Sequence, residues 1–272
     1  MKPLSLDNPS AAQLAAFHTE RELNRQTLSE VTSAAEIANL PLSVAARVDP
    51  RGSELAWHEG VACRKGCGWC CRGVKVEVTP PEAFAIAEYL TSKSEPERLP
   101  AVSNALQDEA DEARSLSATD RWLERRACYF LDQASGTCSI WQVRPLECRS
   151  HSSLDASACE SAHTGWGDGP VIPRSTSLED LYGVARGAMQ TAGEDEGLDM
   201  RSFELTNAVA LAFHVPRAAE RWRAGERVFD RAVIPSDASD REQFERDATR
   251  GSVIPPSRLV PKNRGEAERK LA

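Results

Sequence analysis

The sequence lacks any run of about 18 consecutive apolar residues, which is the length that a membrane-spanning helix needs. The first ten residues also lack the apolar segment that follows the basic residues of a secretory signal. We therefore expect a cytoplasmic protein with no membrane partner. Of its 272 residues 41% are hydrophobic, which is enough apolar material to bury a core.

An excess of positive charge is also missing. The chain has 33 basic and 41 acidic residues, which gives a formal net charge of -8. This charge repels nucleic-acid phosphates unless a local basic patch overrides it. We therefore expect no nucleic-acid partner.

Cysteine is absent from the first 62 and the last 113 residues, so all eight cysteines lie between Cys63 and Cys159. Structural disulfides are rare in the reducing cytoplasm, where clustered cysteines more often bind metal or carry out redox chemistry. The distribution predicts one cysteine-rich module.

Hydrophobic periodicity predicts an α+β, mostly helical protein, in which a small loop-rich cysteine and metal module with short strands is flanked by N- and C-terminal helices. A polar stretch at residues 48–53 marks a boundary before the module. The expected parts are an N-terminal helical arm (1–55), the cysteine-cluster metal-binding module (56–166), a helical C-terminal part (167–250) and a disordered tail (251–272).

Local patterns place individual elements within these parts. Thr79-Pro-Pro-Glu82 has the residues of a capping box with prolines in the first turn, so a helix is expected directly after it. The predicted helices are 10–40, 83–90, 101–115, 120–126, 178–191, 202–214 and 216–229. The predicted strands are 74–78 and a pair within 128–141 that Gln-Ala-Ser-Gly joins.

The densest group of cysteines is a C-x3-C-x2-C-C array formed by Cys63, Cys67, Cys70 and Cys71. Thiolates are the ligands that zinc and iron-sulfur clusters prefer. The spacing is short enough for these cysteines to share one centre. Four further candidate ligands lie downstream and must be brought together by folding, and eight ligands are enough for two four-coordinate sites: Cys128, Cys138, Cys148 and Cys159.

Four thiolates around a divalent ion leave a net charge near -2, which nearby cations must offset. Arg144 and Arg149 are the candidate residues for binding the cofactor in this way. Further cations near the cysteines are Arg64, Lys65, Arg72 and Lys75. Candidate apolar neighbours are Trp69, Trp141 and Trp166, and candidate replacement ligands are His58, His151 and His163.

Two enzyme-like interpretations use the same array. The spacing of Cys63, Cys67 and Cys70, with Trp69 before the last cysteine, resembles the cluster motif of radical S-adenosylmethionine enzymes. Those enzymes need repeated strand-helix units, whereas one short strand and then helices follow Cys71. Cys67-Gly-Trp-Cys70 resembles a thiol-disulfide exchange motif, but that interpretation leaves six cysteines unexplained.

Five elements in order resemble the YkgJ-like, or CxxCxxCC, cysteine-cluster family. They are the opening array, Cys128-Tyr-Phe-Leu131, Gly136-Thr-Cys138-Ser-Ile-Trp141, Arg144-Pro-Leu-Glu-Cys148-Arg149 and Cys159. Trp141 stands where the family usually has tyrosine. The resemblance covers about 100 residues and implies chelation of zinc or iron by the cysteines.

The resemblance leaves the identity of the metal and the question of catalysis open. Flagellin lysine N-methylase has a similar cysteine cluster, so an iron-sulfur enzyme that uses S-adenosylmethionine is one alternative. A zinc-stabilised module that binds a protein partner is another. A metal ion, as zinc or as an iron-sulfur cluster, is the expected cofactor.

Overall fold

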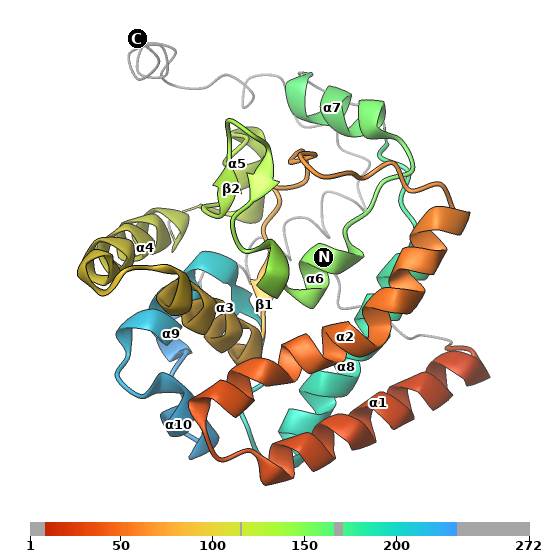
Figure 1. Ribbon diagram of the computed structural model, residues 1–272. Helices are drawn as coiled ribbons and strands as arrows, with labels where there is room; N and C mark the ends of the chain where they lie inside the picture. Colours follow the sequence, from red (N-terminus) through yellow and green to blue (C-terminus); the bar gives the residue numbers. More distant parts are fainter. Residues whose placement is uncertain (1–8, 115, 166–170, 233–272) are drawn as a thin grey trace.

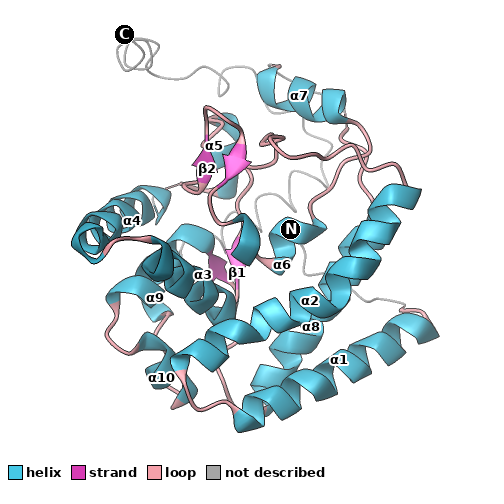
Figure 2. Ribbon diagram, in the orientation of Figure 1, coloured by secondary structure: helices cyan, strands magenta, loops and turns pink. Residues whose placement is uncertain are grey.

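The computed structural model describes residues 9–114, 116–165 and 171–232 (Figure 1). These residues form ten α-helices and two small antiparallel sheets of two strands each, so the prediction of a mostly helical α+β protein is confirmed (Figure 2). Within the described residues, no helix combines the length and the apolar character that a membrane span requires.

The helices are α1 (Ala11–Glu30), α2 (Ala34–His58), α3 (Pro80–Lys93), α4 (Leu99–Arg114), α5 (Ala118–Leu123), α6 (Leu146–Ser150), α7 (Ala156–Thr164), α8 (Thr176–Asp195), α9 (Leu205–His214) and α10 (Ala218–Arg223). The strands are β1 (Glu77–Val78), β2 (Leu131–Asp132), β3 (Thr137–Cys138) and β4 (Phe203–Glu204). Short 3-10 helices are formed by Pro96–Arg98, Trp141–Val143 and Asp230–Ala232.

Helices α1, α2 and α8 pack against one another along one side of the molecule (Figure 1). The predicted helix at 10–40 is in fact two helices that are separated at residues 31–33. The N-cap of the second helix is Ser33, whose backbone N–H donates to the Glu36 carboxylate at 2.9 Å in a capping box. The cap at Ser33 therefore separates two helices that the hydrophobic periodicity predicts as one.

The polar stretch at residues 48–53, where a boundary is predicted, does not interrupt the helix: α2 runs through it to His58 with Pro50 inside it. The polar and small residues there serve tertiary packing. Asp49 accepts a hydrogen bond from the Tyr182 hydroxyl at 2.9 Å. A Cβ atom on Gly52 would overlap the Tyr182 side chain, so glycine allows α8 to approach α2 closely.

Helix α3 begins where the capping pattern predicts. The backbone N–H and the hydroxyl of Thr79 both donate to Oε2 of Glu82 at 2.8 Å. Oε1 of the same carboxylate accepts the backbone N–H of Leu146 at 2.8 Å. Because Glu82 is only 2% exposed, this one buried carboxylate joins the start of α3 to the start of α6.

Only the last two residues of the strand predicted at 74–78 form β structure. Strand β1 pairs antiparallel with β4, with Val78 opposite Phe203. Strand β4 leads directly into α9, which packs against α3 and α4. The partner strand is therefore too short to pair with the rest of the predicted strand.

The hairpin predicted within 128–141 is confirmed, since β2 and β3 pair antiparallel and residues 133–136 connect them. Three predicted helices appear close to their expected positions: those at 101–115, 178–191 and 202–214 are α4, α8 and α9. The helix predicted at 120–126 is α5, which begins two residues earlier.

Helix α10 is shorter than the predicted helix at 216–229, because Arg217 before it and Gly225 after it have left-handed φ angles of 55° and 87°.

One hydrophobic core includes buried residues from Leu28 in α1 to Ala232 near the end of the described chain. Trp222 is its largest fully buried side chain, and its indole N–H donates to the Asp199 carbonyl at 2.8 Å. The division of the chain at residues 55, 166 and 250 stays a prediction. The tail predicted at 251–272 lies outside the described residues.

Candidate metal centre

Four cysteines lie in the loop of residues 61–73, here called the cysteine loop, which connects α2 to the residues before β1. Its beginning is fixed by Ala62, whose N–H donates to the Ser153 carbonyl at 2.8 Å. Its end is fixed by the Cys71 carbonyl, which accepts the N–H of Cys128 at 2.7 Å. Backbone hydrogen bonds thus hold the loop against two segments that are distant in sequence.

The middle of the cysteine loop packs against the turn of the β2–β3 hairpin. Gly66 and Gly136 both have left-handed φ angles, of 82° and 68°. A Cβ atom on Gly136 would overlap the Gly66 carbonyl oxygen. Glycine at this position therefore allows the two backbones to touch.

Cys128 and Cys138 lie on the two sides of this hairpin. The Cys138 backbone pairs with Leu131, and the Ser139 N–H donates to the Phe130 carbonyl at 2.8 Å. Each sulfur accepts a backbone N–H from the residue two positions later, which is Phe130 for Cys128 and Ile140 for Cys138. Such hydrogen bonds favour the thiolate form of a cysteine.

The remaining two cysteines lie on short helices. Cys148 is in α6, and Cys159 is in α7, where it is 8% exposed. Asp155 caps α7, because its carboxylate accepts the N–H of Ser157 at 2.8 Å. Just before α7, the Ser153 N–H donates to Sγ of Cys63 at 3.3 Å. The N-terminal side of α7 is therefore next to the beginning of the cysteine loop.

The predicted ligands are all free thiols, and several of them are near enough for their charges to interact, as Cys63 does with Cys70 and Cys148 does with Cys128. Burial raises the pKa of the Cys128 thiol to about 12. A hydrogen bond with Cys71, followed by burial, raises the pKa of Cys70 well above its usual range. Burial is also the main cause of raised pKa values at Cys63, Cys138, Cys148 and Cys159, and neighbouring sulfurs add to it.

Arg144 is the cation that acts on several of these sulfurs. Its charge lowers the pKa values of Cys70, Cys138 and Cys148, against the larger opposing effect of burial. Its guanidinium carbon lies 4.1 Å from the centre of the Trp141 ring. Its Nε is buried and has no hydrogen-bond partner among the described residues. Arg144 thus has a buried donor available beside the thiols.

Arg149 makes different contacts from Arg144. Its guanidinium pairs with Asp49 of α2 at 2.5 Å, and its Nε donates to the Arg144 carbonyl at 2.8 Å. Asp49 also accepts the Tyr182 hydroxyl of α8. Arg149 therefore ties α6 to two long helices, and its predicted part in balancing the charge of a cofactor stays a prediction.

The donor chemistry fits a thiophilic metal, because the segment from Cys63 to Cys159 holds eight free thiols, backbone N–H donors to sulfur and an Arg144 Nε with no partner among the described residues. Within the described part of the chain, no three His, Cys, Asp or Glu side chains stand in an arrangement that would hold a metal ion as they are. The case for a metal therefore comes from the type of donors and their neighbours.

Residues 62–166 match the model of the CxxCxxCC family, whose description is "Putative zinc- or iron-chelating domain". The match begins one residue before Cys63 and contains all eight cysteines. No curated protein and no solved structure matches the chain. The resemblance seen in the sequence is thereby confirmed for this segment.

The aromatic and histidine residues of the CxxCxxCC segment differ in their burial and in their contacts. Trp69 and Trp122 pack against His163, at ring-centre distances of 6.3 and 4.7 Å, and burial lowers the pKa of His163. His163 also contacts the Cys159 carbonyl through Nδ1 at 2.8 Å. Trp141 is 54% exposed beneath Arg144. This places one histidine of the segment in an apolar setting beside Cys159.

The other candidate residues are exposed or make contacts with groups other than the sulfurs. His58 is at the exposed end of α2, and its side chain is 68% exposed. His151 contacts the Glu147 carbonyl at 2.9 Å, and burial lowers its pKa. Arg64 and Lys65 are exposed, and Arg72 donates to the Gln133 side chain at 3.3 Å. Trp166 lies outside the described residues.

Sequence reasoning missed Ser153 and Trp122. Ser153 is 2% exposed and contacts Cys63 through its backbone N–H. A backbone donor leaves no signature in the residue type, so the sequence carried no signal for it. Trp122 lies in α5 and covers one edge of His163, a contact that depends on tertiary packing.

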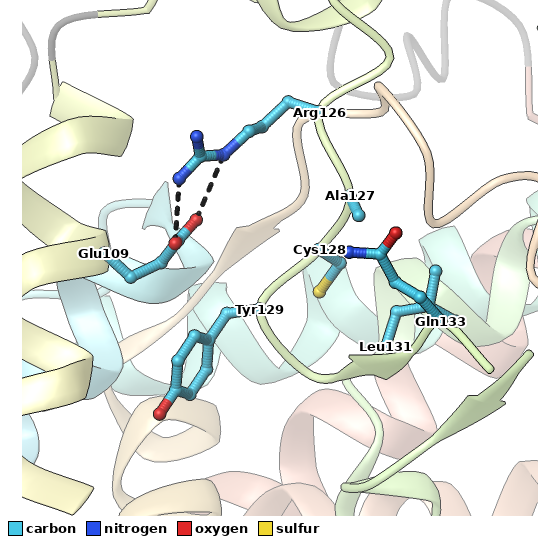
Figure 3. Close-up of a pocket in the computed structure, with 7 residues that line it drawn as sticks. All are labelled: Glu109, Arg126, Ala127, Cys128, Tyr129, Leu131 and Gln133. Carbon is cyan, nitrogen blue, oxygen red and sulfur yellow. Dashed lines mark hydrogen bonds and ion pairs between the residues drawn. The ribbon is translucent and has the colours of Figure 1, made fainter. Parts of the chain in front are cut away.

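A cavity of about 330 Å³ lies beside Cys128 in the CxxCxxCC segment (Figure 3). Figure 3 shows the Arg126 guanidinium paired with Glu109, and these atoms approach to 2.8 Å. The full lining is Glu109, Arg126, Ala127, Cys128, Tyr129, Leu131 and Gln133. The cavity thus borders the residues that lead into the β2–β3 hairpin.

Changing Gly136 to alanine tests the contact between the hairpin and the cysteine loop. We expect the Gly136→Ala chain to bind less metal and to melt at a lower temperature, because the new methyl group overlaps the Gly66 carbonyl in addition to straining a left-handed residue. Metal content and thermal unfolding measure both effects.

Gly197→Ala is the matched control for Gly136→Ala. Gly197 has a similar φ of 72°, but no atom lies within 4 Å of the position that an alanine methyl group would take there. The Gly197→Ala variant therefore has the strain of a left-handed alanine without the overlap, and its metal content should equal that of the wild type. Equal metal content in the two variants would show that metal binding does not depend on the close approach of Gly66 and Gly136.

Proposed function

We propose that this protein binds zinc or an iron-sulfur cluster through Cys63, Cys67, Cys70 and Cys71 together with Cys128, Cys138, Cys148 and Cys159. The observation that carries the proposal is that one segment holds eight free thiols, six of which have raised pKa values, together with an Arg144 Nε that has no partner among the described residues. The match of residues 62–166 to a zinc- or iron-chelating family supports it.

The surrounding groups explain how thiols that are difficult to ionise become ligands. Burial and mutual repulsion favour the protonated thiols, so a bound metal must displace these protons. Backbone N–H groups of Ser153, Phe130 and Ile140 donate to sulfur and stabilise the negative charge that results. Arg144 offsets part of the remaining charge. Bound zinc would stabilise the fold, and a bound cluster would supply electron transfer.

The first test is replacement of Cys67 by serine. Serine has nearly the same size, but its hydroxyl is a poor ligand for zinc or iron. We expect a substantial loss of bound metal and a lower melting temperature, because metal binding contributes directly to the stability of such modules. Elemental analysis and calorimetry on protein purified without oxygen and without a metal-binding tag measure the two quantities.

Arg64→Ala is the control, because Arg64 is an exposed residue of the same loop. Its metal content should be that of the wild type. Full metal content and an unchanged melting temperature in Cys67→Ser would contradict the proposal. A colourless zinc protein and a brown iron-sulfur protein are distinguished by the visible spectrum of the wild type.

The two alternative functions stay predictions. An iron-sulfur methyl-transferring enzyme must bind S-adenosylmethionine, and calorimetric titration of the metal-loaded protein with that compound tests it. A zinc-stabilised interaction module needs zinc for its fold and does not bind that compound.

A further inference from the structure

Asp49 of α2 is the acceptor for side chains from two other helices. Its Oδ2 pairs with the Arg149 guanidinium of α6 at 2.5 Å, and its Oδ1 accepts the Tyr182 hydroxyl of α8 at 2.9 Å. Helices α2 and α6 both pack against α8 (Figure 1). Asp49 and Tyr182 lie outside residues 62–166, whereas Arg149 lies within them. One carboxylate thus joins two flanking helices to the CxxCxxCC segment.

Gly52 makes room for this contact. It lies one turn after Asp49, and a Cβ atom there would come within 2.5 Å of the Tyr182 hydroxyl oxygen. Glycine is unfavourable inside a helix, so the helix itself gives no reason for it. Tyr182 is buried, and a buried hydroxyl needs a hydrogen-bond partner. The space at Gly52 allows that hydroxyl to reach Asp49.

Arg149 connects Asp49 to the segment that carries Cys148. Its Nε donates to the Arg144 carbonyl at 2.8 Å, so the same side chain holds the residue before α6 and the carboxylate of α2. Cys148 lies between Arg144 and Arg149 in the sequence. The Arg149 side chain is 11% exposed, so water is a poor substitute for the partners that it has. Fixing Arg149 therefore restricts the positions of Cys148 and Arg144.

We infer that Asp49 is a positioning residue of the metal centre, which through Arg149 holds Cys148 and Arg144 in the arrangement that binds metal. The inference rests on the proposed function, since it requires a metal that Cys148 helps to bind. Asp49 contributes through Arg149 and not as a ligand, and Tyr182 supports Asp49 from α8. Two helices outside the CxxCxxCC segment therefore take part in metal binding.

Asp49→Asn in the full chain tests this role. Asparagine has the same size and can still accept the Tyr182 hydroxyl, but it lacks the charge that pairs with Arg149. We expect the variant to lose half of its metal at an about tenfold lower chelator concentration than the wild type, because a hydrogen bond between charged groups contributes about a factor of ten to an equilibrium constant. Elemental analysis after each chelator step, on protein purified without oxygen, measures the metal that is kept.

Glu20→Gln is the matched control, because it breaks an ion pair of the same kind between two long helices. Glu20 of α1 pairs with Arg47 of α2 at 2.8 Å, and Arg47 also donates to Asn24 of α1 at 2.7 Å. This pair joins α1 to α2 and not α2 to α6. We expect both variants to melt at a lower temperature than the wild type, but only Asp49→Asn to release its metal more readily. A residue that merely stabilised helix packing would not separate the two measurements.

Tyr182→Phe is a milder second variant. It removes the hydroxyl that supports Asp49 and leaves the ion pair with Arg149 in place. We expect a shift of about threefold in the chelator concentration, in the same direction as for Asp49→Asn, because one neutral hydrogen bond contributes less than a charged pair.

The outcomes separate the positioning role from the proposed function. A wild-type chain that holds no metal would overturn both. If the wild type holds metal and Asp49→Asn releases it at the same chelator concentration as Glu20→Gln, the positioning role alone is overturned. If Asp49→Asn does not fold, an unchanged chelator concentration for Tyr182→Phe has the same consequence.

Discussion

Replacing Glu82 with alanine is expected to lower the free energy of unfolding by about 4 kcal/mol, since three buried donors lose their acceptor and each unsatisfied group costs about 1–3 kcal/mol. The donors are the N–H and hydroxyl of Thr79 and the N–H of Leu146, all at 2.8 Å. Urea denaturation followed by circular dichroism measures the loss.

The loss should extend to the metal site, because Leu146 begins the helix that carries Cys148. Glu36→Ala is the matched control. Glu36 has the same place in the capping box of α2, but it is exposed, so water can satisfy the donors that it leaves. Its effect should be much smaller and should leave metal content unchanged. Equal losses in the two variants would show that the link between α3 and α6 contributes nothing.

Replacing Arg121 with methionine is expected to cost about 3–5 kcal/mol, because breaking a buried ion pair leaves a charge without its partner. Arg121 and Glu204 are 4% and 3% exposed and approach to 3.1 Å. Glu204 also accepts two hydrogen bonds from Asn207 at 2.8 Å and so begins α9. Thermal and urea unfolding of the variant measure the cost.

Two comparisons isolate the buried charge. Arg126→Met removes an arginine whose side chain is 28% exposed and paired with Glu109 and the exposed Glu112, so it should cost no more than about 1 kcal/mol. Adding Glu204→Gln to Arg121→Met removes the unpaired carboxylate and should recover part of the stability. Equal losses in the free energy of unfolding for Arg121→Met and Arg126→Met would show that burial of the Arg121–Glu204 pair does not increase the cost of breaking it.

The elements that the sequence predicts well are those determined by neighbouring residues. The capping residues Thr79 and Glu82 define the start of α3, and the turn at 133–136 defines the β2–β3 hairpin. The polar and small residues at 48–53 do not break α2, and Asp49 and Gly52 instead contact Arg149 and Tyr182. Long-range packing overrides the usual meaning of such residues in this case.

In the candidate site, too, some features follow from the local sequence and others depend on tertiary contacts. The cysteine spacing identified the eight thiols, since their number and density are properties of the sequence alone. Arg144 and Arg149 both lie within four residues of Cys148 in the sequence, yet one stacks on Trp141 beside the sulfurs and the other pairs with Asp49. That difference depends on α2, which lies far away along the chain.

The two attachments of the cysteine loop also have a consequence for the newly made chain. Cys63 to Cys71 leave the ribosome first, whereas the segments that hold them, up to Cys159, are made later. At typical rates of synthesis the early thiols remain without these partners for on the order of 10 s. During this interval they are open to oxidation or to premature capture of metal, so the order of the cysteines along the chain sets a period in which the cell must keep them reduced.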